Sequence, residues 1–129
     1  MDLTEFREAM EAECGSSSAG TWHIVDETLT GWSQKAFRPW IIVDDPGSGP
    51  NVQMVPRSTK IRRGAKFLPH ESHQHGPLDT DRTSCRINEP GTICAAQRRP
   101  IHRKWIAGPR SYSCREPDDA ILQALGCQR

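Results

Sequence analysis

The chain has no long apolar run, no CxxC pair and almost no net charge. None of its 129 residues belongs to an apolar stretch near the roughly 18 to 20 residues of a membrane span, so we expect no transmembrane helix. The five cysteines are odd in number and give no paired framework, which favours reduced thiols. The formal net charge of +1 by itself predicts no polyanionic partner.

The first residues are acidic and lack an apolar core, which argues against a secretory signal peptide. We therefore expect a cytoplasmic protein with no membrane partner. Hydrophobic residues make up only 35% of the chain, with 10 glycines and 10 prolines, a composition that fits one small, loop-rich domain.

Two regions are expected along the chain. Residues 1–20 predict a short acidic helix over Asp2–Cys14, where Leu3, Phe6 and Met10 fall at helical spacing, followed by a Gly/Ser linker. Residues 21–129 predict a barrel domain that carries the function.

Short strands separated by turns dominate the second region. Pro39–Asp44 and Asn51–Pro56 predict a hairpin, and a closing helix is expected over Glu116–Leu125, stopped by Gly126. A second hairpin is expected around the turn Glu89-Pro90-Gly91. The strands expected besides the first hairpin are Thr21–Asp26, a short one around Ala65–Leu68, Ser84–Asn88, Thr92–Gln97 and Pro100–Trp105. This pattern predicts a mainly β fold, a small curved barrel-like sheet with minor helix.

The first hairpin carries the strongest chemical signal. Arg38 precedes a proline at the start of one strand, and Ser58 lies just past the end of the other. If the strands pair, a permanent cation stands beside a hydroxyl, a combination suited to a phosphodiester. The alternative for Arg38 is an ion pair with Asp44, Asp45 or Glu27, and for Ser58 a hydroxyl that closes a turn.

Two basic runs flank this pair and contain no acid. Residues 57–66 hold Arg57, Lys60, Arg62, Arg63 and Lys66, and residues 98–104 hold a second basic cluster. Local basic patches attract nucleic acid even on a neutral protein. The alternative is solvated surface. The expected RNA-binding residues are Trp32, as a stacking platform, and Arg57, Lys60, Arg62, Arg63, Arg98 and Arg99.

A histidine-rich segment needs separate interpretation. His70, His73 and His75 lie within six residues, and Cys85 follows. Imidazoles and a thiolate at such spacing are possible zinc ligands. Because no second cysteine follows at ligand spacing and Gly76-Pro77 interrupts any regular element, we expect a solvated loop, with no metal and no cofactor.

Four segments, taken in order, resemble the MazF/PemK family, the ribonuclease toxins of type II toxin–antitoxin systems. The first is Arg38-Pro39 with its aliphatic strand, and the second is Val55-Pro56-Arg57-Ser58-Thr59. The third is the strand from Ile93 that ends in Gln97 and leads into a basic stretch, and the fourth is the closing helix.

This resemblance implies an SH3-like barrel, a homodimer and a groove for single-stranded RNA across the dimer interface. It implies a metal-independent, sequence-selective endoribonuclease, held in check by a cognate antitoxin protein. By position, Arg38 matches the family's catalytic arginine and Ser58 its catalytic Ser/Thr, with Thr59 as the fallback. Gln97 matches a position near the RNA path.

An arginine is a poor general base, because its pKa lies above about 12. Better candidates to accept the 2′-hydroxyl proton are His23, Glu27, Asp26 and His102. Two other functions stay open: a non-catalytic RNA- or protein-binding member of the same fold, and a small metal-binding regulatory protein built on the histidine loop.

Overall fold

A computed structural model describes residues 19–31, 37–73, 87–106 and 114–127. The expected N-terminal helix, Trp32, His75, Cys85 and the first part of the strand expected at Ser84–Asn88 lie outside these ranges. Within them, no helix is long and apolar enough to cross a membrane.

The described chain is mainly β, as the sequence predicts. Its seven strands are β1 (Thr21–Val25), β2 (Arg38–Asp44), β3 (Asn51–Ser58), β4 (Leu68–His70), β5 (Gly91–Ile93), β6 (Arg99–His102) and β7 (Cys114–Arg115). Three 3₁₀ helices are described, η1 (Glu27–Thr30), η3 (Ala95–Gln97) and η4 (Arg103–Trp105), and one α-helix, α2 (Asp119–Leu125).

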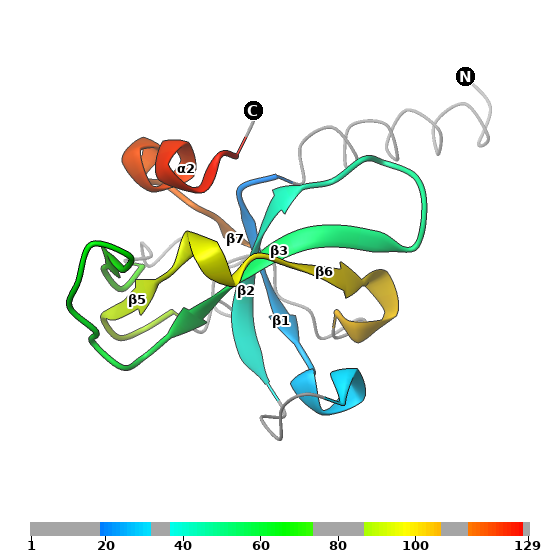
Figure 1. Cartoon of the computed structure of the whole chain (residues 1–129), viewed down its shortest axis with the longest axis horizontal. Helices are drawn as coiled ribbons and strands as arrows, with labels where there is room; N and C mark the ends of the chain where they lie inside the picture. The colour runs from blue at the N-terminus through cyan, green and yellow to red at the C-terminus, as the bar shows by residue number, and fades with distance from the viewer. Residues whose placement is uncertain (1–18, 32–36, 74–86, 107–113, 128–129) are drawn as a thin grey trace, which may run out of the picture.

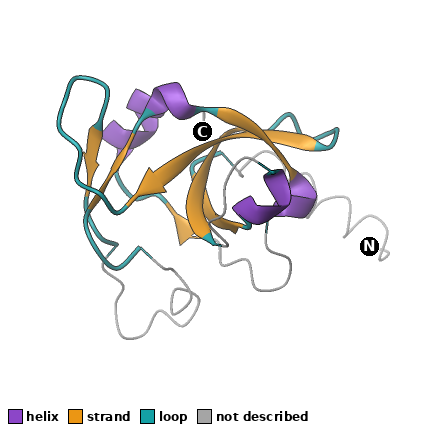
Figure 2. Cartoon of the chain, turned by 60° about the horizontal axis from the view of Figure 1, so that its bottom comes forward, coloured by secondary structure: helices purple, strands orange, loops and turns teal. Residues whose placement is uncertain are grey.

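All strand pairs are antiparallel, in the order β4-β5-β3-β2-β1-β7, with β6 added to β3. Strand β3 has three neighbours. Its first residues pair with β2 and β6, whereas Arg57 and Ser58 pair with β5. In Figure 1 β3 crosses β2 and ends beside β5. The long strands are strongly curved, so the sheet curls into a half-barrel (Figure 2).

Two apolar clusters lie on opposite faces of the sheet. The first contains Trp22, Ile41 and Val55, and α2 covers it with Ile121, Leu122 and Leu125; its other members are Val43, Ile87, Ile93 and Cys114. The second contains Val25, Trp40, Ile42, Val52, Met54 and Ile101, with Trp105 and Ile106 packed against it. Alternation along the strands produces this division, since neighbouring residues such as Ile41 and Ile42 point to opposite faces.

The first predicted hairpin is confirmed: Trp40 lies opposite Pro56 and Ile41 opposite Val55. The second predicted hairpin is wrong. Gly91–Ile93 pairs with β4 and with the end of β3, and residues 95–97 turn into η3. The short strand expected around Ala65–Leu68 lies at Leu68–His70, because there it pairs with the buried β5.

Two other boundaries differ from expectation because side chains cap the backbone. The strand expected over Pro100–Trp105 ends at His102, whose Nδ1 accepts from the Lys104 N–H and starts η4. The closing helix begins at Asp119, since the Asp118 carboxylate accepts from the Ala120 N–H. Glu116, expected in that helix, is instead buried before it.

Gly91 is the position where β5 approaches β3 most closely. A Cβ there would lie 2.1 Å from the Ser58 carbonyl oxygen and 3.1 Å from the Arg57 guanidinium carbon. No side chain fits unless the backbone moves.

Gly91→Ala should therefore lower the free energy of unfolding by about 3 kcal/mol, the upper end for overpacking, because the added methyl meets backbone as well as a buried side chain. Urea denaturation of the wild type and the variant measures this difference. Equal midpoints would show that β5 and β3 are not in this close contact.

Candidate active site

Arg38 is fixed by a buried carboxylate. Strand β1 ends at Val25, and the Asp26 side chain caps η1 by accepting from the Thr28 N–H at 3.1 Å. This turn places Glu27, which is fully buried, against β2. Arg38 Nε donates to Glu27 Oε2 at 2.6 Å and Nη2 donates to Oε1 at 2.9 Å, a bidentate pair.

The same guanidinium remains partly open to solvent. The Arg38 side chain is 23% exposed, and its Cζ lies 5.6 Å from the centre of the Trp40 ring. Glu27 engages Nε and Nη2, which leaves Nη1 to donate to an incoming anion. The ion pair weighed as the alternative for Arg38 is thus formed with Glu27, and it orients the cation rather than removing it from reach.

Ser58 lies at the end of β3, opposite Thr92. Its Oγ accepts from the Lys60 N–H at 3.1 Å, so the hydroxyl closes a turn, yet its own proton stays available to a ligand. Arg38 is two residues from Trp40 along β2, and Ser58 is two residues from Pro56 along β3. Trp40 and Pro56 lie opposite each other in the sheet. Strand alternation therefore points both toward the same face of the sheet.

Arg38 and Ser58 make no hydrogen bond with each other. Beyond Pro56, β3 leaves β2 and joins β5, whereas the start of β2 stays beside β1 (Figure 1). Their predicted convergence on one phosphate stays a prediction.

The other proposed helpers of catalysis fall in different places. Thr59 is exposed, next to Ser58. His102 pairs with Asn51, at the opposite end of β3 from Ser58. Seven residues of strand span roughly 23 Å, so His102 lies far from Ser58 along β3. Its ring caps η4, and its role as a helper of catalysis stays a prediction.

His23 lies in β1, paired with Trp40 of β2, and its side chain is largely buried. Its Nε2 lies 2.8 Å from Thr21 Oγ1, and its buried Nδ1 has no hydrogen-bond partner. Burial lowers the pKa of His23 to about 4, an effect that the negative charge of Asp45 partly offsets. At neutral pH the ring is uncharged.

Of the expected RNA-binding residues that the structure describes, all but one are exposed. Lys60, Arg62 and Arg63 are exposed between β3 and β4, and Gln97, Arg98 and Arg99 are exposed around η3. Arg57 is only 3% exposed, so its assignment as a surface RNA contact is wrong. Alternation along β3 held the signal, because Arg57 is in step with Val55, which is buried in the cluster that α2 covers.

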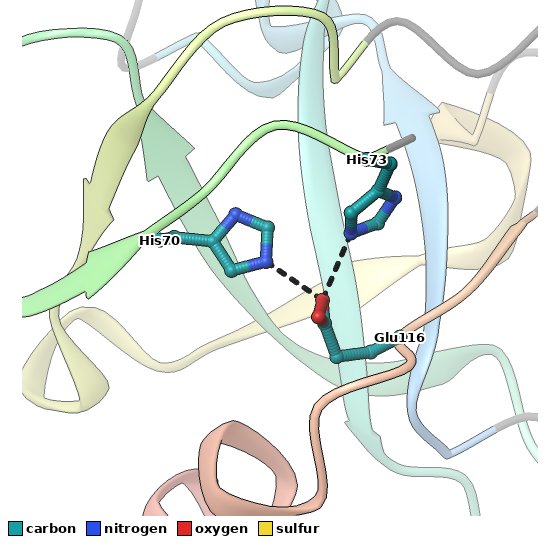
Figure 3. A group of neighbouring side chains, drawn as sticks. All are labelled: His70, His73 and Glu116. Carbon is teal, nitrogen blue, oxygen red and sulfur yellow. Dashed lines mark hydrogen bonds and ion pairs between the residues drawn. The ribbon is translucent and has the colours of Figure 1, made fainter. Parts of the chain in front are cut away.

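Sequence reasoning missed one cluster on that face. His70, His73 and Glu116 bring their nitrogen and oxygen atoms within 4.8 Å of one another. Figure 3 shows both rings pointing at the Glu116 carboxylate. The His70/His73 spacing was visible in the sequence, but Glu116, 43 residues beyond His73, was read as helix and gave no signal.

No protein-family model matches the chain, and no curated protein matches its sequence. Solved structures similar in fold include an endoribonuclease in complex with its cognate antitoxin, from a Mycobacterial species. It shares 15% identity at a TM-score of 0.53, over 84% of this chain and 86% of that one. At this identity the likeness shows a common fold.

The depressed pKa of His23 makes stability depend on pH. The unfolded chain binds a proton near pH 6.5 and the folded chain only near pH 4. The free energy of unfolding therefore decreases by about 3 kcal/mol as the pH falls through this window.

His23→Gln should remove that loss. The difference in unfolding free energy between wild type and variant, measured in urea at pH 7 and at pH 4, isolates the contribution of this side chain from other acid-sensitive groups. Parallel losses in the two proteins would contradict the assignment.

Proposed function

We propose that this protein is the toxin of a type II toxin–antitoxin system, an endoribonuclease that cleaves single-stranded RNA without a metal ion. The observation that carries the proposal is the Arg38 guanidinium, clamped by buried Glu27 at the start of β2 with Nη1 left to donate. The fold shared with an endoribonuclease in complex with its cognate antitoxin supports it.

The proposed reaction is attack by the 2′-oxygen on the adjacent phosphorus. The bond from phosphorus to the 5′-oxygen breaks, that oxygen takes up a proton, and a 2′,3′-cyclic phosphate remains. Negative charge grows on the phosphate oxygens during this step. Arg38 can stabilise that charge, and because Glu27 already fixes its orientation, little reorganisation is needed when the transition state forms.

Ser58 has a complementary role in this proposal. Its Oγ is occupied as an acceptor by the Lys60 N–H, so the hydroxyl proton is the group it offers to a phosphate oxygen. The exposed cations Lys60, Arg62 and Arg63 follow directly along the chain and supply attraction for the rest of the strand.

The partners proposed are single-stranded RNA, a second copy of the chain and an antitoxin. The neighbouring structure contains a cognate antitoxin, which supports the last of these. An antitoxin would block cleavage by covering the exposed cations around the site.

Arg38→Ala should reduce cleavage of a long RNA in the presence of EDTA by roughly 10² to 10³-fold, because charge stabilisation in the transition state is lost. Arg38→Lys should restore little, since an ammonium cannot form the bidentate pair with Glu27. End mapping of the products should find 2′,3′-cyclic phosphates.

Arg103→Ala is the matched control. Arg103 also pairs with a carboxylate, that of Asp45, at 2.7 Å. It lies in η4, which follows the end of β6 that pairs with the start of β3. At saturating RNA the Arg103→Ala variant should cleave with the wild-type kcat, because the pair of Arg38 with Glu27 is intact. RNA that the wild type binds but leaves intact would favour a non-catalytic binding protein, and cleavage that needs added metal would contradict the mechanism.

A further inference from the structure

Residues from three segments distant in the sequence meet at one carboxylate oxygen of Glu116. Glu116 Oε2 is 2.9 Å from Trp22 Nε1, 2.7 Å from His70 Nε2 and 3.0 Å from His73 Nε2. Burial alone would raise the pKa of Glu116, but these three hydrogen bonds hold it well below its ordinary value. The carboxylate is therefore an anion, and each nitrogen facing it carries a proton.

The other nitrogen of His70 fixes the protonation of that ring. Arg57 Nε donates to His70 Nδ1 at 2.9 Å, and Arg57 also donates to the Glu89 carbonyl oxygen. An arginine has no acceptor, so Nδ1 must supply a lone pair. His70 is thus neutral, with its single proton on Nε2.

Arg57, His70 and Glu116 consequently form a continuous chain of donors. Arg57 is 3% exposed and Glu116 is 1% exposed. The neutral His70 ring lies between them and is hydrogen-bonded to both. The set has no net charge and its members satisfy one another, which is the condition for burying ions without a large loss of stability.

His70, His73 and Glu116 together have the composition of a zinc site, but the proton on His70 does not suit one. A metal binds the lone pair of a neutral imidazole. On His70 that lone pair belongs to Nδ1 and is held by Arg57. A metal ion bound at Nε2 would leave the ring proton on Nδ1, where it would face the N–H of Arg57. The ion would also add positive charge beside a buried guanidinium.

Arg57 is also the residue before Ser58, at the point where β3 turns from β2 toward β5. Gly91 packs directly over both, as its close approach to the Ser58 carbonyl and the Arg57 guanidinium shows. An anchor on Arg57 therefore fixes the backbone that carries Ser58.

We propose that Glu116, His70 and Arg57 are a metal-free positioning relay that holds Ser58 in place from the opposite face of the sheet. The part that concerns catalysis rests on the proposed function. The three residues touch no substrate; they act through the end of β3.

A pair of substitutions at His70 tests the relay. His70→Gln keeps an acceptor for Arg57 and a donor for Glu116, whereas His70→Leu keeps neither. For RNA cleavage, His70→Gln should retain kcat within about threefold of wild type. His70→Leu should lose at least about tenfold in kcat with little change in KM, because a small displacement of a catalytic group lowers the rate more than binding.

Three results would overturn the proposal: a wild-type kcat in both variants, the same loss of kcat in both, or stoichiometric zinc in the wild type that both variants lose. Two readouts do not depend on cleavage. Nitrogen NMR of the wild type should find the proton of His70 on Nε2, and the Lys60 amide, which donates to Ser58, should exchange faster in His70→Leu than in His70→Gln. If the wild type cleaves no RNA but these two results hold, the proposed function fails and the anchor on β3 stands; a proton on Nδ1 would refute the anchor itself.

Discussion

The fold depends on the bend of β3 and on the buried cation that anchors it. One strand pairs with β2 and β6 along its first residues and with β5 at its last two, so it joins both parts of the sheet. The residue at the change of partners is Arg57, whose charge would be costly to bury alone. Glu116, reached through His70, supplies the compensating charge, and Gly91 leaves room for the guanidinium.

The two faces of the sheet hold different groups. The face under α2 holds the apolar cluster around Trp22 and the polar chain that ends at Glu116. The other face presents Arg38, held by Glu27. A buried carboxylate thus holds Arg38 directly, and in the proposed arrangement a second one, that of Glu116, holds the backbone of Ser58 through His70 and Arg57.

Local patterns in the sequence predicted the first hairpin, the mainly β class and the closing helix, because strand alternation, proline and helix capping act over a few residues. They failed where tertiary contacts decide. The expected hairpin around Glu89-Pro90-Gly91 did not form, since Gly91–Ile93 is buried between β3 and β4. Arg38 was identified from its place before a proline, but its partner Glu27 was only one of three acids considered. Glu116 could not have been assigned, because its partners are 43 or more residues away.

The most direct test of the account is the crystal structure of the protein with a short RNA whose 2′-hydroxyl at the cleaved position is replaced by hydrogen. The account predicts that Arg38 Nη1 and the Ser58 hydroxyl both lie within hydrogen-bond distance of the same phosphate, while Glu27 keeps both contacts to Arg38. A phosphate bound elsewhere, or one that Arg38 touches with Ser58 too distant to share it, would contradict the assignment of this site.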